Sequence, residues 1–318
     1  MIHQLDFNGR DKVDKAIMRL QAYEPEEGYF LCFSGGKDSS VIKVLADMAG
    51  VKYDAHYHCT SVDPPELIRF IKDNHPDVII DFPRDKDGNR ITMWNLIPRK
   101  KMPPTRLVRY CCKELKEQGG KGRLKVTGVR WAESVNRKKN QGEVTFMDKK
   151  TKAIIEKELS DEDFSSTPRG GVVLHLDNIE NRRMVEMCYK THTTTINPII
   201  DWSNDEVWEF IKEYNVPYCC LYDEGFKRIG CIGCPMGSVK QRQYEFDRYP
   251  KYKALYLKAF EKMIENRGGY NEQRNSLLRM ADSGRCDARI HNGELQESGG
   301  VRDYKDMTPE EIMEWWIQ

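Results

Sequence analysis

The sequence predicts an α/β fold in which helices cover both faces of a parallel sheet, followed by a helical C-terminal region. Three observations support this prediction. Short apolar runs alternate with amphipathic stretches over the first third of the chain, which is typical of βαβ units. A glycine-rich loop joins the first apolar run to the first amphipathic stretch. From about residue 239 onward the pattern is helical and polar.

The βαβ units can be followed along the chain. Residues 28–33 form an apolar run that predicts a buried strand. Residues 38–49 place apolar side chains at helical spacing and stop at Gly50, a residue that commonly follows a helix end. The pattern then predicts a strand, a helix and two further strands, at about 53–58, 64–74, 78–80 and 124–128.

An insertion interrupts this pattern. Between about residues 138 and 190, short alternating runs and a turn-rich stretch replace the βαβ units. The sheet pattern resumes at 193–198, and Ser203 with Glu206 forms a capping box that starts another helix. We therefore expect a first domain over residues 1–238, with the insertion at about 138–190, and a helical region over 239–318.

The composition is that of a soluble chain. Of the 318 residues, 39% are hydrophobic and 32% are charged, and no stretch approaches the ~18 consecutive apolar residues of a membrane helix. The first residues lack a basic region followed by an apolar one. We therefore expect a cytoplasmic protein with no membrane partner. The formal net charge of +1 gives no whole-molecule argument for nucleic-acid binding.

The loop between the first strand and the first helix has the composition of a phosphate-binding loop. It consists of Ser34, Gly35, Gly36, Lys37, Asp38 and Ser39. Two glycines let the backbone turn tightly and bring its amides against an oxyanion, and a helix N-terminus adds partial positive charge. The spacing is not that of a Walker A loop. An ordinary strand-to-helix turn is the alternative interpretation of Gly-Gly at this point.

Three separated motifs resemble a known family, in that family's order: Ser34–Ser39; Gly128-Val129-Arg130 with Arg137; and Asn197–Trp202 followed by Leu221–Phe226 and Gly230-Cys231. The first is similar to the pyrophosphatase loop, or PP-loop, of N-type ATP pyrophosphatases. The other two resemble the phosphoadenosine phosphosulfate reductase branch. The resemblance implies a Rossmann-like, adenine nucleotide alpha hydrolase-like domain that binds ATP or adenylyl sulfate.

This resemblance also implies roles for individual residues. The loop amides and Lys37 stabilise charge on the phosphate under attack, while Mg²⁺ neutralises the pyrophosphate leaving group and Asp38 helps to hold it. Gly128, Arg130 and Arg137 face the phosphates or sulfate. We expect Lys37, Asp38 and Arg130 to be catalytic and the whole set to bind the nucleotide.

Four of the ten cysteines are candidate metal ligands. Cys231 and Cys234 form a CxxC turn that lets both sulfurs face one centre, and Cys111-Cys112 can complete four thiolates. Structural zinc takes the same four sulfurs. The resemblance implies a [4Fe-4S] cluster on these four residues, as in the family's adenylyl-sulfate-reducing members. Cys219 is the substitute if the adjacent pair does not reach.

The sequence departs from the family's reductases at its C-terminal end. Their catalytic cysteine lies in a Glu-Cys-Gly-His-like tail, whereas this chain ends at Gln318 without it, and Cys286 is the remaining C-terminal cysteine. We therefore expect an ATP-pyrophosphatase-type sulfurtransferase of sulfur metabolism. The alternatives are a phosphoadenosine or adenylyl sulfate reductase that uses a different thiol or a partner protein as sulfur or electron donor, and a nucleotide-binding subunit of a nucleic-acid modification or defence assembly.

Residues 99–139 are strongly basic, with fourteen lysines and arginines against three glutamates. Such a segment produces a positive field that attracts polyanions. Arg130 and Arg137 account for part of it. The remaining lysines and arginines have three interpretations: contacts to a nucleic-acid substrate such as tRNA or DNA, balance of a cluster's negative charge, or a solvated face.

Overall fold

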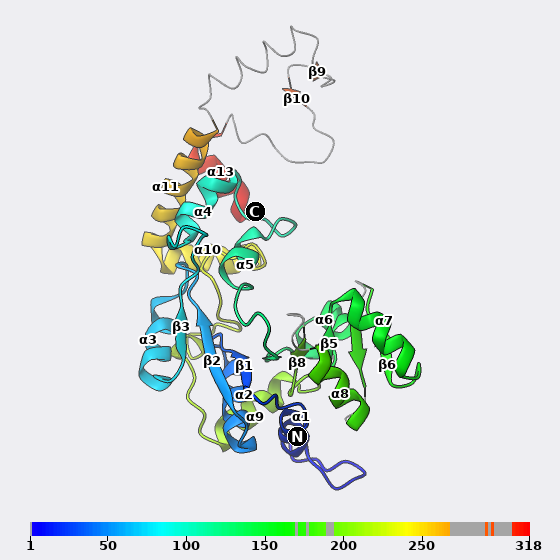
Figure 1. The fold of residues 1–318 in the computed structure, drawn as a ribbon. Helices are drawn as coiled ribbons and strands as arrows, with labels where there is room; N and C mark the ends of the chain where they lie inside the picture. The colour runs from blue at the N-terminus through cyan, green and yellow to red at the C-terminus, as the bar shows by residue number, and fades with distance from the viewer. Residues whose placement is uncertain are drawn as a thin grey trace. The chain divides into compact units, whose positions relative to one another are not determined.

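The computed structural model describes residues 2–168, 171–175, 178–188, 194–267, 290–291, 294–295 and 307–318. The chain forms two compact units, each built from separate segments (Figure 1). The sheet unit contains Met1–His58, Pro64–Asp81 and Gln118–Ile229. The helical unit contains Cys59–Asp63, Phe82–Glu117 and Gly230–Gln318.

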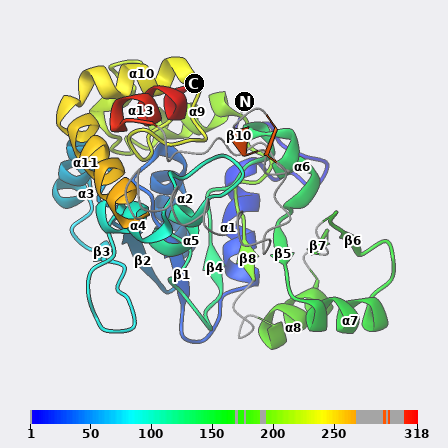
Figure 2. The ribbon, with the colours of Figure 1, turned by 90° about the horizontal axis from the view of Figure 1, so that it is seen from above.

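An eight-stranded sheet is the framework of the sheet unit, and its strands run across Figure 2 in the order β3-β2-β1-β4-β8-β5-β7-β6. Five neighbouring strands are parallel: β3 (Ile79–Asp81), β2 (Tyr53–His58), β1 (Tyr29–Cys32), β4 (Lys125–Val126) and β8 (Thr195–Ile196). This confirms the predicted α/β fold with a parallel sheet.

The insertion extends this sheet with antiparallel strands. They are β5 (Val144–Phe146), β7 (Val172–Leu174) and β6 (Phe164–Ser166). The same region contributes α6 (Val135–Asn140), α7 (Lys149–Glu158) and α8 (Ile179–Cys188). The sequence predicted an insertion here but no sheet extension, because strands of three residues are too short for a period-two pattern to be recognised.

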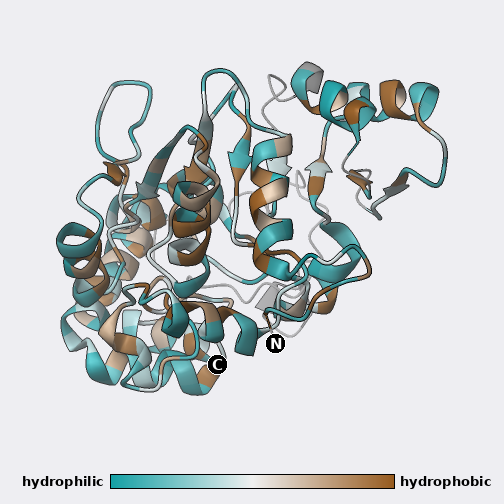
Figure 3. Ribbon diagram, turned by 90° about the horizontal axis from the view of Figure 1, so that it is seen from below, coloured by the Kyte–Doolittle hydropathy of each residue, from teal (hydrophilic) through white to brown (hydrophobic). Residues whose placement is uncertain are grey.

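The main helices of the sheet unit are α1 (Lys12–Ala22), α2 (Lys37–Ala49), α3 (Pro65–Asn74) and α9 (Asn204–Glu213). Three of them, α2, α3 and α9, lie where the sequence predicts helices, and α1 was not predicted. Gly50 ends α2 in the left-handed conformation, and Ser203 caps α9 with the expected capping box. Polar and apolar residues alternate along the helices in Figure 3, as in helices with one buried face. α2 packs against both α1 and α9.

The helical unit is built around the packing of α11 against α4 and α13. Its elements are α4 (Met93–Lys100), α5 (Tyr110–Leu115), α10 (Val239–Arg248), α11 (Pro250–Asn266), α13 (Pro309–Ile317) and the two short antiparallel strands β9 (Ile290–His291) and β10 (Glu294–Leu295). Fully buried Leu96 and Ile97 of α4 share one core with Phe260 of α11. None of the helices in the described part of the chain combines the length and apolar composition needed to cross a membrane.

The helical unit differs from the expected C-terminal region over residues 239–318. It begins at Gly230 and also recruits the earlier segments Cys59–Asp63 and Phe82–Glu117. The apolar face of α4 explains the difference, because its side chains are buried against helices that lie about 150 residues later in the chain. A domain boundary predicted from the local sequence pattern cannot include such a long-range contact.

Candidate functional site

The loop between β1 and α2 leaves the start of a helix without a side-chain cap from its own N-cap residue. Gly36 is the residue before α2, its backbone is extended, and it offers no side chain to cap the helix. The first amides of a helix have no partner within the helix and carry partial positive charge. This end of α2 therefore favours a negatively charged group.

The two glycines of the loop face different surroundings. Gly35 has a φ of +71°, and a Cβ there would lie 2.6 Å from Leu67 Cδ1 and 2.9 Å from Ile71 Cδ1 of α3. A Cβ at Gly36 would meet only the hydroxyl oxygens of Ser34 and Tyr222, each at 3.4 Å. Gly35 is thus required by packing, whereas Gly36 keeps the backbone open to a ligand.

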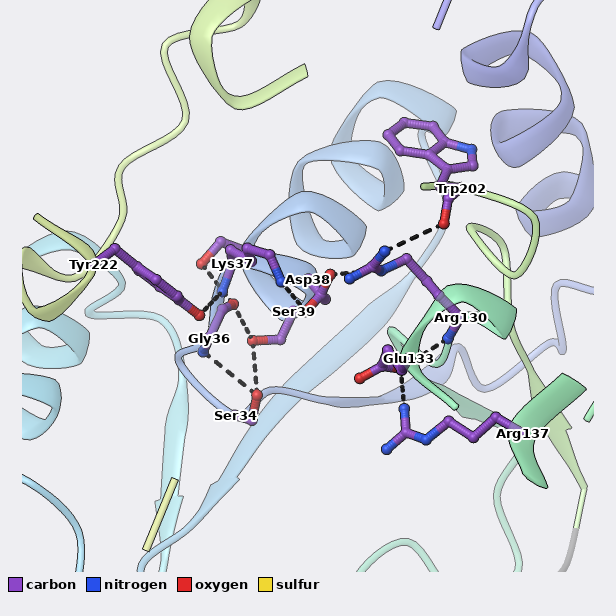
Figure 4. A network of polar contacts seen from close by, with 11 residues as sticks. Ser34, Gly36, Lys37, Asp38, Ser39, Arg130, Glu133, Arg137, Trp202 and Tyr222 are labelled. Carbon is purple, nitrogen blue, oxygen red and sulfur yellow. Dashed lines mark hydrogen bonds and ion pairs between the residues drawn. The ribbon is translucent and has the colours of Figure 1, made fainter. Parts of the chain in front are cut away.

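Two buried cations share one carboxylate beside the loop. Lys37 Nζ lies 3.0 Å from Asp38 Oδ2, and Arg130 Nε donates to Asp38 Oδ1 at 2.8 Å (Figure 4). Lys37 is 6% exposed and Arg130 is 3% exposed. Arg130 also donates to the carbonyl of Trp202 at 3.2 Å, which fixes its guanidinium. Two positive charges against one negative charge make this site attractive to an anion.

Gly128 allows the segment that carries Arg130 to approach α2. A Cβ at Gly128 would lie 3.1 Å from the backbone of Asp38. Arg137 is held differently, because it forms an ion pair with Glu133 one turn earlier in the chain, and Glu133 accepts a hydrogen bond from the backbone amide of Arg130 at 3.0 Å. Among the residues that the structure describes, Glu133 is the link between Arg137 and the loop network (Figure 4).

The two loop serines complete the network. Ser34 Oγ donates to Ser39 Oγ at 3.2 Å, and Ser39 Oγ donates to the carbonyl of Gly36 at 2.8 Å. The structure thus brings the predicted loop residues, Gly128 and Arg130 into one connected group. Their roles in binding remain predictions.

Sequence reasoning did not place Tyr222 at this site. The amide of Lys37 donates to Tyr222 Oη at 3.0 Å, and Tyr222 approaches the loop from the side opposite to Arg130 (Figure 4). Burial raises the pKa of Tyr222 above its usual range, and the charge of Asp38 raises it further. The only signal in the sequence was the position of Tyr222 within the third family-like motif, which named no contact for it.

All four predicted cysteine ligands lie in the helical unit. Cys111 and Cys112 are on α5, and Gly233, with a φ of +71°, forms the turn between Cys231 and Cys234. The neighbouring thiol of Cys112 raises the pKa of Cys111, and that of Cys111 lowers the pKa of Cys112. The charges of the CxxC pair raise the pKa of Cys111 further. All four cysteines thus belong to one compact unit.

Polar groups surround the CxxC turn. Cys231 Sγ lies 3.5 Å from Thr60 Oγ1, and burial raises the pKa of the Cys231 thiol while the positive charge of Lys116 opposes that shift. Within the described ranges, no group of three or more His, Cys, Asp or Glu side chains has an arrangement suited to a metal ion.

Cys219 is fully buried in the sheet unit, where burial raises its pKa to about 11. Cys286 lies outside the described residues.

The basic segment divides into paired and unpaired parts. Lys100 pairs with Glu114 at 2.8 Å, and Arg123 pairs with Asp54 at 2.6 Å. In contrast, Lys138 and Lys139 have no ion pair with any described residue. They line a cavity of about 180 Å³ in the sheet unit, together with Trp131 and His175 among other residues.

Comparison with known proteins supports the family resemblance. The model of the phosphoadenosine phosphosulfate reductase domain matches residues 28–236. An uncharacterized protein of Methanocaldococcus jannaschii is 26% identical over 254 residues, which cover 76% of this chain and 48% of that protein. The adenosine 5'-phosphosulfate reductase of Allochromatium vinosum is 51% identical over 39 residues, which cover 12% of this chain and 15% of the enzyme. The chain thus spans about half the length, or less, of these curated relatives.

Two solved structures are similar at low sequence identity. The phosphoadenylyl-sulfate reductase of Candida auris, in a phosphate complex, has a TM-score of 0.36 and 16% identity, and the match covers 72% of this chain and 96% of that one. The FMN adenylyltransferase of Candida glabrata, with FMN and an ATP analogue, has a TM-score of 0.37 and 13% identity, with coverages of 70% and 63%. The domain match over residues 28–236 takes in more than half of the chain, which therefore belongs to the phosphoadenosine phosphosulfate reductase family.

Proposed function

We propose that the protein is an adenine-nucleotide-dependent enzyme of sulfur metabolism, acting as an ATP-pyrophosphatase-type sulfurtransferase. One observation carries the nucleotide part of the proposal: buried Lys37 and Arg130 flank Asp38 at the glycine loop that opens α2. Family membership and this charge arrangement both favour an anionic adenine nucleotide as the ligand.

The loop residues are suited to bond cleavage at the α-phosphate. The amides at the start of α2 are fixed before a ligand arrives, so they stabilise developing negative charge without reorganisation. Lys37 adds a positive charge at the same place. Arg130 orients Asp38 and, through its anchored guanidinium, adds a second cation. In this proposal Lys37, Arg130 and the loop amides hold the triphosphate of ATP or the adenylyl sulfate group, and Asp38 positions the two cations.

In this proposal Mg²⁺ is not assigned to Asp38. Both of its carboxylate oxygens are already engaged, one by Lys37 and the other by Arg130. Magnesium commonly enters such enzymes on the substrate's phosphates and keeps several waters. We therefore assign no reaction step to Mg²⁺ through Asp38.

We also propose that Cys111, Cys112, Cys231 and Cys234 hold a [4Fe-4S] cluster. Four thiols within one compact unit, two of them in a CxxC turn, have the donor chemistry that such a cluster requires. When bound, the cluster supplies electron transfer or a site for sulfur chemistry. The ammonium of Lys116 balances negative charge at Cys231, and Gly233 keeps the turn short. A structural zinc ion is the competing occupant.

A reductase that draws electrons or sulfur from a partner protein is the alternative for the same nucleotide site. The short local match to adenosine 5'-phosphosulfate reductases favours it. The two reactions release different products, which are pyrophosphate from ATP and sulfite from adenylyl sulfate. Product identity therefore separates them.

The test is to incubate anaerobically purified protein with ATP or with adenylyl sulfate and to measure pyrophosphate and sulfite. Pyrophosphate release that is lost in Asp38→Ala supports the proposal, because that variant leaves Lys37 and Arg130 without their shared partner. Asp73→Ala, which removes an exposed carboxylate on α3, is the matched control and should keep full activity. Sulfite release from adenylyl sulfate alone would establish the reductase instead. Turnover of neither nucleotide would refute both.

A nucleic-acid substrate is a second candidate, favoured by the cavity beside α6. Lys138 and Lys139 are exposed at its rim, and Trp131 contributes an aromatic ring to its lining. Lysines that contact phosphates together with an aromatic ring that stacks on a base are typical of single-strand binding. In this view the acceptor of the transferred sulfur is tRNA or DNA.

A further inference from the structure

Tyr222 is a polar side chain at the loop for which the sequence predicted no role. It ends a single 3-10 turn, Cys220–Tyr222, which follows fully buried Cys219 and contains fully buried Leu221. Its ring makes an edge contact with Trp208 at a centroid distance of 5.2 Å. These contacts fix the direction of the ring, so its hydroxyl is held at the loop rather than sampling solvent.

The hydroxyl of Tyr222 has an unused hydrogen. Tyr222 Oη accepts the hydrogen bond from the Lys37 amide at 3.0 Å, and a phenol that accepts one bond still has its own O–H to donate. Among the residues that the structure describes, none accepts this hydrogen. The Oη atom lies 3.4 Å from where a Cβ of Gly36 would stand, which is the open face of the loop.

We propose that Tyr222 donates its hydroxyl hydrogen to a phosphate or sulfate oxygen of the ligand bound at the loop. The inference rests on the proposed nucleotide site and adds one contact to it. Burial and the nearby charge of Asp38 raise the pKa of Tyr222, so the phenol remains protonated over the working pH range. The Lys37 amide polarises the hydroxyl by donating to it, which strengthens the O–H as a donor.

Tyr218 provides a matched control. It also packs edge-on against Trp208, at a centroid distance of 5.3 Å, but it is exposed and its hydroxyl donates to Asp223 at 3.1 Å. Tyr222→Phe and Tyr218→Phe therefore each remove one hydroxyl from the same aromatic group. Only the first removes a donor that faces the loop.

The experiment measures binding of inorganic pyrophosphate and of ATP to the full chain by titration calorimetry, with thermal unfolding as the check on folding. Tyr222→Phe should weaken both affinities by roughly 10-fold or more, the size expected for losing a hydrogen bond to a charged oxygen, while Tyr218→Phe leaves them unchanged. Wild-type affinity in Tyr222→Phe would overturn the inference and leave the proposed function standing. Tighter binding in Tyr222→Phe would also overturn it, because the hydroxyl would then compete with the ligand. If wild-type protein binds neither probe, the proposed function fails together with the inference.

Discussion

Replacing Gly35 by alanine should destabilise the sheet unit through two separate effects. The first is the left-handed backbone at φ +71°, which costs a residue with a Cβ about 1–2 kcal/mol. The second is overpacking, because the new Cβ would lie 2.6 Å from Leu67 Cδ1 and 2.9 Å from Ile71 Cδ1. Both atoms end flexible side chains, so the α3 face yields at a cost of about 1–3 kcal/mol. Together the free energy of unfolding should fall by about 2–5 kcal/mol.

Gly50 isolates the steric part of this loss. It lies at the other end of α2 with a φ of +67°, and no atom lies within 4 Å of where its Cβ would stand. Gly50→Ala should therefore lose only the backbone contribution of about 1–2 kcal/mol. The assay is urea unfolding of both variants, followed by far-UV circular dichroism. Equal destabilisation of the two variants would refute the close packing of Gly35 against α3.

Three further predictions concern the cysteines, the basic helix and the N-terminal segment. Protein purified without oxygen should be brown and contain about four irons per chain. The double variant Cys231→Ser, Cys234→Ser should lose this colour. A colourless wild-type preparation that contains one zinc per chain would instead support a structural metal. The double variant Lys138→Gln, Lys139→Gln should bind tRNA or DNA with a weaker dependence on salt. Each lost phosphate contact reduces the slope of log affinity against log salt concentration. If the wild type binds neither nucleic acid at 100 mM salt, the nucleic-acid candidate is contradicted. His3 contacts two carboxylates that raise its pKa above the ordinary 6.5. The wild type should therefore have a higher free energy of unfolding than a His3→Gln variant, with the full difference below pH 6.5 and a smaller one as pH rises through the folded-state pKa. Urea unfolding of both proteins at pH 5.5 and 8.5 measures this difference.

Features set by neighbouring residues were predictable from the sequence. The glycine loop, the left-handed Gly50 and the capping box at Ser203 each depend on a few consecutive residues, and the structure confirms the helix limits that they predict. The parallel strands were recognised because their apolar runs are bounded by turn residues. In each case the chemistry that determines the conformation lies within one turn or one loop.

Features set by distant contacts were not predictable in this way. The hydrogen bond between the Lys37 amide and Tyr222 joins residues 185 positions apart, and nothing in the local pattern of either segment specifies it. The helical unit is a second example, because α4 is buried by α11 far along the chain. Arg137 is a third: its expected contact with the ligand competes with a local ion pair to Glu133, one helical turn away.

Gly35 and Gly36 have different roles, which explains why one short loop can be packed against the core and still leave its backbone accessible to a ligand. Gly35 is buried against α3, so this glycine fixes the loop to the core, while half-buried Gly36 has no side chain that could cover the start of α2, where the Lys37 amide donates to Tyr222. A substitution at Gly35 should therefore mainly lower the free energy of unfolding. Gly36→Val should instead lower nucleotide affinity and turnover and leave the circular dichroism spectrum unchanged. A Gly36→Val variant that binds ATP like wild type would show that the ligand does not approach the backbone on this face, and the phosphate would then have to be held by side chains alone.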